Sequence, residues 1–247
     1  TIIGVPMANW LGQAVGWRWA FVVVAALALT TVVLVRLFAL RAPVEEGASP
    51  LRELGALARG QVWLSLLIGA IGFGGLFSVY TYLANTLVDV TAMDIRHTPW
   101  MFAIFGVGLT LGNLIVPRFA DRALMPSAGA LLVWSAVALA LYPLAAHNVW
   151  TMALDVLAIG LGGALGTVLQ TRLMDVAGDA QALAAALNHS AFNTANALGP
   201  WLGGLAVAAG YGWTSTGLVG CALALGGLLI WVMSYATSRP TTARSAA

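Results

Sequence analysis

The chain has 247 residues and a formal net charge of +2, with 60% hydrophobic and only 8% charged residues. Soluble domains carry about 25% charged residues, so this composition excludes a water-soluble globular surface and indicates a protein surrounded by lipid. The single cysteine, Cys221, excludes a disulfide framework, and no Cys/His metal pattern occurs. We therefore expect no catalytic residues, no metal site, no cofactor and no nucleic-acid partner.

Apolar runs long enough to cross a membrane follow one another along nearly the whole chain. A helix needs about 20 apolar residues to cross hydrocarbon, and lipid requires each segment to satisfy its own backbone hydrogen bonds. The sequence supplies one partial run and seven full runs, at 1–14, 19–40, 61–88, 99–117, 127–146, 149–171, 182–209 and 214–236. We predict an all-α polytopic membrane protein with about eight transmembrane helices, the first of them truncated.

The partial run begins at Thr1, inside an apolar stretch. No charged segment and no cleavage site accompany it, which argues against a signal peptide. We expect this run to be the end of a helix that starts upstream.

The connection at 41–60 differs from the others in length and polarity. It holds three arginines, three glutamates and two prolines, whereas the connections at 147–149 and 210–213 are short enough to force antiparallel neighbours. We expect a short surface helix at 50–58. The polar segment is the natural boundary between two halves of the bundle.

The arginines indicate the orientation of the chain. If the connections alternate between two sides, one side holds Arg36, Arg41, Arg52, Arg59, Arg118, Arg122, Arg172, Arg239 and Arg244. The other side holds only Arg18 and Arg96. Arginine-rich loops stay in the cytoplasm, so the first side is predicted to be cytoplasmic. The apolar runs are defined without reference to charge, so the uneven distribution of arginines between the two sides is an independent check on the number of spans.

The run 182–209 carries a polar stripe. His189, Asn193, Asn196 and Pro200 stand at i, i+4, i+7 and i+11 and so share a narrow face of a helix. One interpretation is a face that lines a cavity or transport pathway, because polar side chains in hydrocarbon usually face water or the bundle interior. The alternative is hydrogen bonding between packed helices.

The run 61–88 has a second stripe of this kind. Gly74, Ser78, Tyr82 and Asn85 lie on one face, with Tyr80 and Thr81 nearby. Two tyrosines and an amide on a glycine-rich helix suit the recognition of an aromatic or polar solute. The alternative is that the tyrosines belong to the aromatic belt at the membrane interface.

Asp155 is the one acid well inside a predicted span. A charged carboxylate at the centre of a bilayer costs roughly 3 kcal/mol or more, so an acid there is a candidate for proton coupling. Asp155 also lies only about one and a half turns from the extracytoplasmic end of its run. The alternative is that its carboxylate reaches water at that end.

Four stretches in the right order resemble the major facilitator superfamily, in particular the drug:proton antiporter branch that includes chloramphenicol, arabinose and purine exporters. They are Gly4-Val5-Pro6 with Leu11-Gly12-Gln13, Phe77-Ser78 with Thr81-Tyr82, Gly112-Asn113 with Arg118 and Asp121, and Asn188-His189 with Asn193 and Leu198-Gly199-Pro200. The resemblance runs through almost all of the chain. It departs from the family pattern at Pro117 and Ala8, where glycines are usual.

The resemblance implies that the chain holds helices five to twelve of a twelve-helix transporter. Residues 1–40 would end the N-terminal bundle, 41–60 would be a cytoplasmic linker, 61–236 would form a C-terminal six-helix bundle, and 237–247 would be a cytoplasmic tail. The turn with Arg118, Asp121 and Arg122 would form an ion-pair latch; otherwise it is a solvated turn. Gly4, Pro6, Gly12, Gly199 and Pro200 would form a helix-packing motif.

The function implied by the resemblance is efflux of small molecules across the bacterial cytoplasmic membrane. It would proceed by proton-coupled antiport with alternating access, in a multi-pass protein that works as a monomer. Its partners would be the lipid bilayer, a small-molecule substrate and protons. Two alternatives remain: a truncated membrane protein that does not transport, and a membrane-embedded enzyme. The second lacks the paired carboxylates or nucleophile–base pairs that catalysis requires.

Overall fold

The structure is a computed structural model that describes residues 4–38, 55–178 and 180–238. Within these residues every regular element is helical and none is a strand, which confirms the all-α prediction. The elements are α1 (Gly4–Val15), α2 (Trp17–Phe38), η1 (Gly55–Ala58), α4 (Gly60–Leu67), η2 (Ile68–Gly72), α5 (Gly74–Asp89), η3 (Ile95–His97), α6 (Thr98–Ile115), α7 (Pro117–Ala120), α8 (Leu124–Ala145), α9 (Val149–Gly162), α10 (Leu165–Ala177), α11 (Gln181–Ala206), η4 (Val207–Tyr211) and α12 (Ser215–Thr237).

These elements join into the passes expected from the apolar runs. The π-helical turn η2 links α4 to α5, and a short break at Gly163 and Ala164 separates α9 from α10. In the described part of the chain, six of the resulting helices are long and apolar enough to cross a membrane. The 26-residue helix α11 has the length but carries the polar stripe, and α1 has only 12 residues.

Two parts of the predicted organisation lie mainly outside the described residues. Of the linker 41–60, the structure describes the 3₁₀ turn Gly55–Ala58 followed by Arg59 and Gly60. That turn falls at the end of the surface helix expected at 50–58. Of the tail 237–247, it describes only the first two residues.

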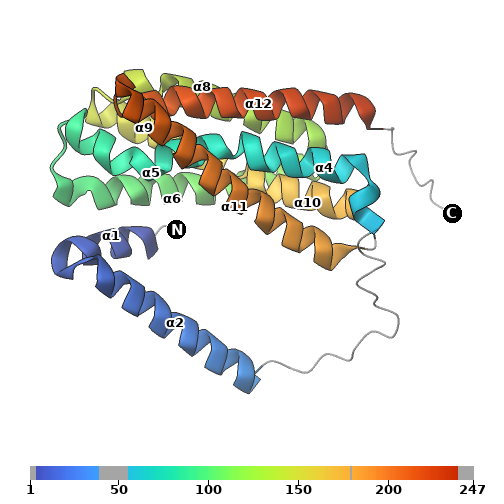
Figure 1. Cartoon of the computed structure of the whole chain (residues 1–247), viewed down its shortest axis with the longest axis horizontal. Helices are drawn as coiled ribbons and strands as arrows, with labels where there is room; N and C mark the ends of the chain where they lie inside the picture. Colours follow the sequence, from blue (N-terminus) through green and yellow to red (C-terminus); the bar gives the residue numbers. More distant parts are fainter. Residues whose placement is uncertain (1–3, 39–54, 179, 239–247) are drawn as a thin grey trace.

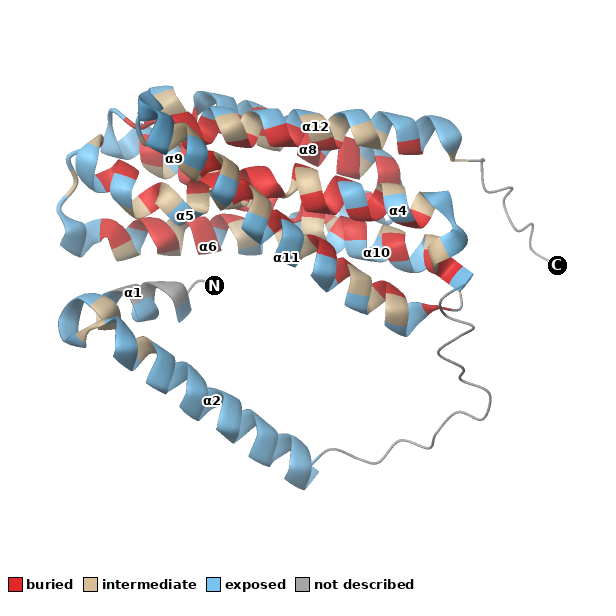
Figure 2. Ribbon diagram, in the orientation of Figure 1, coloured by how far each residue is buried: buried red, intermediate tan, exposed pale blue. Residues whose placement is uncertain are grey.

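Helices α4 to α12 form one bundle, and α1 and α2 form a hairpin beside it (Figure 1). The hairpin meets the bundle near α6, where the Gln13 side chain donates hydrogen bonds to the Ile95 carbonyl and the Thr98 hydroxyl. Helix α2 then diverges from the bundle and buries none of its residues (Figure 2). Its apolar surface is therefore open along its whole length.

The ends of the bundle agree with the alternation deduced from the arginines. The Arg59 guanidinium, before α4, donates a hydrogen bond to the Val176 carbonyl at the end of α10. Arg172 bonds to Gln61 at the start of α4 and to Ser238 after α12. Residues predicted to be cytoplasmic from separate connections thus meet at one end of the bundle.

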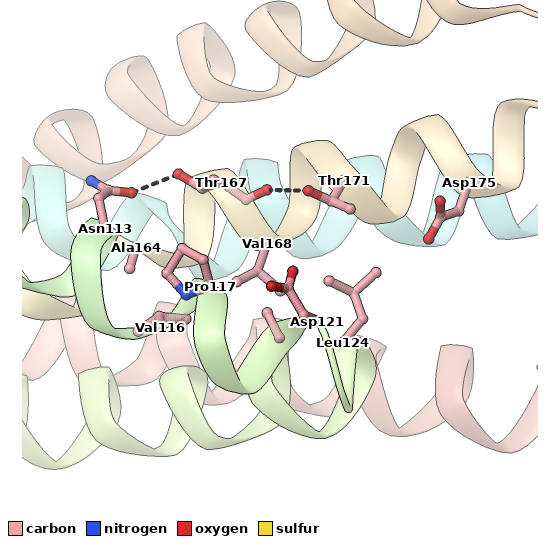
Figure 3. Close-up of a pocket in the computed structure, with 11 residues that line it drawn as sticks. Asn113, Val116, Pro117, Asp121, Leu124, Ala164, Thr167, Val168, Thr171 and Asp175 are labelled. Atoms are coloured by element: carbon pink, nitrogen blue, oxygen red, sulfur yellow. Dashed lines mark hydrogen bonds between the residues drawn. The ribbon is translucent and has the colours of Figure 1, made fainter.

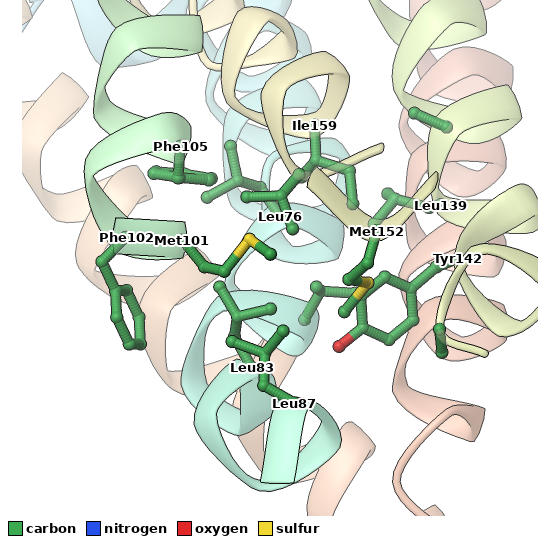
Figure 4. Close-up of a cluster of buried hydrophobic side chains, with 14 of the residues drawn as sticks. Leu76, Leu83, Leu87, Met101, Phe102, Phe105, Leu139, Tyr142, Met152 and Ile159 are labelled. Carbon is green, nitrogen blue, oxygen red and sulfur yellow. The ribbon is translucent and has the colours of Figure 1, made fainter. Parts of the chain in front are cut away.

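The bundle interior near the opposite end is filled by apolar side chains from α5, α6, α8 and α9 (Figure 4). Leu87, Tyr142 and Met152 have no exposed surface there. Figure 4 shows the phenol ring of Tyr142 packed against Met152 with its hydroxyl directed toward α5. This packing holds α5 between α6, α8 and α9.

Glycines let α5 and η2 approach both α11 and α12 at backbone contact. A Cβ atom added at Gly199 of α11 would collide with the carbonyl oxygen of Gly74, and one added at Gly227 of α12 would collide with Gly72. Small residues drive such close packing in membranes, where van der Waals contact replaces the hydrophobic effect as the attraction between helices. Gly199 therefore sets the distance between α5 and α11.

We predict that Gly199→Val destabilises the bundle by about 1–3 kcal/mol or more, because overpacking a tight contact forces the backbones apart. The measurement is the midpoint of thermal unfolding of the detergent-purified protein. Gly60→Ala is the matched control, since a Cβ atom at Gly60 meets nothing within 4 Å. An unchanged midpoint in Gly199→Val would show that the α5–α11 contact is not tight.

Candidate functional site

The polar side chains exposed on the bundle are distributed unevenly among its helices. Helix α8 exposes only apolar residues, among them Val133, Val137, Leu141 and Leu144. Before its last turn, helix α12 likewise exposes only apolar residues. The exposed polar residues between the helix ends come instead from α5, α6, α10 and α11: Thr81, Asn85, Thr110, Thr167, Gln170, Thr171, His189, Ser190, Asn193, Thr194 and Asn196.

The predicted stripe on α11 is exposed. His189, Asn193 and Asn196 face outward from the bundle, and Pro200 is half-buried. Within the described residues, no hydrogen bond involves the His189 imidazole or the two amides, whereas Ser190 and Thr194 bond to carbonyls of their own helix. The three side chains are thus available to a ligand, to water or to another part of the protein.

The predicted stripe on α5 divides into two groups. Ser78 is fully buried and donates a 2.9 Å hydrogen bond to the Thr216 carbonyl of α12. The Tyr82 hydroxyl donates a 3.0 Å bond to the Pro200 carbonyl of α11. Thr81 and Asn85 are exposed. Ser78 and Tyr82 therefore tie helices together in this structure, and Thr81 and Asn85 remain open.

Asp155 is 8% exposed, and its Oδ2 atom has no hydrogen-bond partner among the described residues. The nearby polar groups come from two other helices. The Tyr142 hydroxyl of α8 lies within electrostatic reach of the Asp155 carboxylate and beside the Thr86 hydroxyl of α5. No sequence pattern predicts this arrangement, because Tyr142 and Thr86 lie on separate spans and neither belongs to a polar stripe.

A cleft of about 290 Å³ opens between α6, α7, α8 and α10 toward the end of the bundle that is predicted to be cytoplasmic (Figure 3). Across it the Thr167 hydroxyl of α10 donates a 2.6 Å hydrogen bond to the Asn113 side chain of α6. Asp121 and Asp175 both line it. The sequence did not predict the hydrogen bond between Asn113 and Thr167, although Asn113 belongs to one of the four stretches that resemble the family.

The predicted latch residues lie at the edge of this cleft. The Arg118 guanidinium donates a hydrogen bond to the Leu114 carbonyl of its own helix, and Asp121 lines the cleft. Arg118, Asp121 and Arg122 are all exposed. An ion-pair latch is therefore still a prediction about another state of the protein.

The predicted helix-packing residues of α1 and those of α11 differ in their contacts. Gly199 lies in backbone contact with α5, whereas a Cβ atom at Gly4 would meet nothing within 4 Å and one at Gly12 would only touch the Trp17 Cα at 4.0 Å. Pro6 lies in α1, and its side chain is outside the described part. Among the glycines of this motif, only Gly199 of α11 makes a close contact with another helix.

A polar network joins α4, α10 and α12 at the end of the bundle that is predicted to be cytoplasmic. The Gln61 side chain of α4 donates to the Ser234 carbonyl and the Thr237 hydroxyl of α12, and its oxygen accepts from the Ser234 hydroxyl at 2.8 Å. The same oxygen accepts a 3.3 Å hydrogen bond from Arg172 of α10. Gln61 therefore accepts hydrogen bonds from a fully buried hydroxyl and from one nitrogen of a half-buried guanidinium.

Comparison with known proteins places these features in a family. Residues 1–133 and 93–247 each match the family model described as Major Facilitator Superfamily. The chain is 34% identical to the inner membrane transport protein YdhP of Escherichia coli, over 97% of the chain and 61% of that protein. It is 32% identical to a chloramphenicol resistance protein of Streptomyces lividans, over 81% of the chain and 52% of that protein.

A probable sugar efflux transporter of Haemophilus influenzae is 29% identical, over 98% of the chain and 61% of that protein. The chain thus spans between about half and three fifths of the length of these curated relatives.

Groups of three or more His, Cys, Asp or Glu side chains able to hold a metal ion do not occur among the described residues.

We predict that Gln61→Leu destabilises the bundle by about 1–3 kcal/mol, because it leaves the buried Ser234 hydroxyl without an acceptor and removes one of the two side-chain acceptors of Arg172. The change is measured as a lower thermal midpoint in detergent. Gln170→Leu is the control, since Gln170 is exposed and takes no part in the network. Equal midpoints for the two variants would contradict a stabilising role for the network.

Proposed function

This chain belongs to the Major Facilitator Superfamily, and from that premise we propose that the protein carrying it is a proton-coupled exporter of small molecules. It is a multi-pass protein of the cytoplasmic membrane. Membership of a transporter family favours transport over a membrane-embedded enzyme. We infer alternating access as the mechanism and a monomer as the working unit.

The observation that carries the proposal is the contrast between the outer faces of the helices. Exposed amides and hydroxyls in hydrocarbon are costly and therefore face water or other protein. They gather on α5, α6, α10 and α11, while α8 and the membrane-spanning part of α12 expose apolar side chains to lipid. The polar faces are those that would line a substrate pathway between this bundle and a second bundle.

In the proposed site the substrate lies against exposed polar groups of α5 and α11. Thr81 and Asn85 would contact it from α5, and His189, Asn193 and Asn196 from α11. Ser78 and Tyr82 lie beneath these groups and would join the site when the contacts between α5, α11 and α12 rearrange. A mostly apolar pathway with a few hydrogen-bonding groups suits an uncharged solute that carries hydroxyl or amide groups.

The names of the relatives support this substrate class without narrowing it further. One relative is named for sugar efflux and another for chloramphenicol resistance. We propose a small sugar-like or largely apolar compound with several hydrogen-bonding groups as the exported solute.

We propose that Asp155 takes up and releases the coupling proton. The supporting observation is a buried carboxyl group whose Oδ2 atom has no hydrogen-bond partner in the described chain. The Tyr142 hydroxyl of α8 lies within electrostatic reach of this carboxyl group, and that hydroxyl lies beside Thr86 of α5. Binding a proton removes a charge whose cost in hydrocarbon is roughly 3 kcal/mol or more.

The organisation into two halves completes the proposal. Residues 1–40 would belong to the N-terminal half and 61–236 to the C-terminal half, with 41–60 as the cytoplasmic linker and 237–247 as the tail. Support comes from α2, which buries no residue against the bundle. The latch of Arg118, Asp121 and Arg122 would close when the halves move together at the cytoplasmic end.

We predict that Asp155→Asn abolishes accumulation of solute driven by a pH gradient and leaves solute exchange without a gradient intact. The measurement uses inside-out membrane vesicles with an acidified interior. A radiolabelled solute that the unmodified protein accumulates serves as substrate. Asp89→Asn is the matched control, since Asp89 is exposed at the end of α5. Gradient-driven accumulation that persists in Asp155→Asn would remove this residue from the coupling mechanism.

We predict that Asn193→Leu raises the apparent KM for the solute about 3- to 10-fold, because a hydrogen bond to the solute is lost. The initial rate of transport at several solute concentrations provides the measurement. Thr194→Ala should leave the KM unchanged, since its hydroxyl already bonds to the Ser190 carbonyl. If both variants gave the same KM, the exposed face of α11 would not contact the solute.

A further inference from the structure

The surface between α8 and α9 contains a groove of about 390 Å³ with Asp155 in its lining. Its walls are Leu141 and Leu144 of α8 and Leu154 of α9. Leu144 is 74% exposed and Leu154 68% exposed, so both face outward from the bundle. Since α8 exposes only apolar residues, this groove opens toward lipid rather than toward the polar faces of α5 and α11.

The groove is closed at both ends by hydrogen bonds between the two helices. At its inner end the Trp134 indole of α8 donates a 2.8 Å hydrogen bond to the Ala158 carbonyl of α9. At its outer end the Thr151 hydroxyl donates a 2.9 Å bond to the Ala145 carbonyl. Between these bonds the small side chains of Ala145 and Ala158 leave room. A molecule would therefore enter sideways, from the bilayer.

With the arginine-rich end of the bundle in the cytoplasm, as predicted, the depth of the groove corresponds to the outer leaflet. Helix α9 begins at Val149, and Asp155 follows six residues later, which is roughly 9 Å along the helix at 1.5 Å per residue. Trp150, at the start of the helix, is 79% exposed, as expected for a side chain at the membrane interface. The carboxyl group thus lies below the interface, at the level of lipid chains.

The chemistry of the lining specifies the charge of the ligand. Asp155 is more than nine-tenths buried, and its Oδ2 atom has no hydrogen-bond partner in the described chain. In its ionised form this carboxylate would be left unpaired by a lipid chain or another neutral apolar molecule in the groove, and it would repel an anion. A cation with an N–H group would pair with it through a charge-assisted hydrogen bond.

We propose that the groove between α8 and α9 binds a protonated lipophilic amine that arrives through the outer leaflet. Its N–H group donates to the Asp155 carboxylate, and its apolar body lies against Leu141, Leu144 and Leu154. Only a small part of Asp155 is exposed, so a primary or tertiary amine fits better than a quaternary ammonium, which has no N–H donor. The site shares Asp155 with the proposed proton coupling, but binding needs no transport cycle and does not rest on it.

The test is photolabelling of the full chain in phosphatidylcholine nanodiscs at neutral pH. The probe is dodecylamine with a diazirine in its chain, compared with the dodecanol analogue carrying the same diazirine. Labelled peptides are identified by mass spectrometry. We expect the amine, at low concentration, to label 141–145 and 151–158, and the alcohol to label these segments at least about tenfold less, because it lacks the charge-assisted hydrogen bond.

Two variants and one control variant test the assignment of the site. Asp155→Asn should lower labelling by the amine about tenfold while leaving labelling by the alcohol unchanged, and Asp89→Asn should alter neither. Ala158→Phe, which fills the groove and keeps the carboxylate, should lower labelling by the amine as well. Equal labelling of these segments by amine and alcohol would overturn the proposal, as would unchanged amine labelling in Asp155→Asn.

The outcome also separates this site from proton coupling. If Asp155→Asn loses gradient-driven transport but keeps amine labelling, the amine site is wrong and the coupling role stands. If it keeps gradient-driven transport but loses amine labelling, the amine site stands and the coupling role is wrong.

Discussion

Hydrocarbon cannot form hydrogen bonds, and this constraint governs every polar group in the described bundle. Inside the bundle, polar side chains are paired across helices, as Ser78 is with the Thr216 carbonyl and Gln61 is with Ser234. Outside it, amides and hydroxyls are confined to α5, α6, α10 and α11. The faces of α8 and most of α12 are left apolar for lipid. The distribution of polarity therefore divides the surface into a lipid face and a candidate solute face.

Close contact between glycines makes this division possible. Gly74 meets Gly199 and Gly72 meets Gly227, so α5 and η2 lie against both α11 and α12 at backbone distance. The same contacts bring the Tyr82 hydroxyl to the Pro200 carbonyl and the Ser78 hydroxyl to the Thr216 carbonyl. Groups proposed to meet the solute thus share helix interfaces with groups that hold the bundle together. Movement at these interfaces would therefore change both the groups proposed to meet the solute and the contacts that hold the bundle together.

Asp155 departs from this pairing, since its Oδ2 atom has no hydrogen-bond partner in the described chain, and neither has the buried hydroxyl of Tyr142. Its carboxyl group lies between the Tyr142 hydroxyl in the bundle interior and the groove between α8 and α9 at the lipid face. A single acid so placed is in reach of two different cations, a proton and a membrane-borne amine. The two roles make separate demands, since the first depends on the transport cycle and the second only on the shape and charge of the groove.

The sequence by itself determined the helices and their order, because the length of an apolar run responds directly to the thickness of a membrane. The placement of arginine predicts their orientation. It also determined that α11 has a polar face, since 3.6-residue periodicity is a property of one helix alone. The end of one span was missed, at 171 instead of Ala177, because polar residues continue α10 past the hydrocarbon.

Only the tertiary structure decided which polar residues are buried. Ser78 and Thr81 lie within one turn of each other, yet one is buried against α12 and the other is exposed, because burial depends on the neighbouring helix. The surroundings of Asp155 come from α5, α8 and α9 together. Their residues are far apart in the chain, and no local pattern specifies which helices will pack side by side.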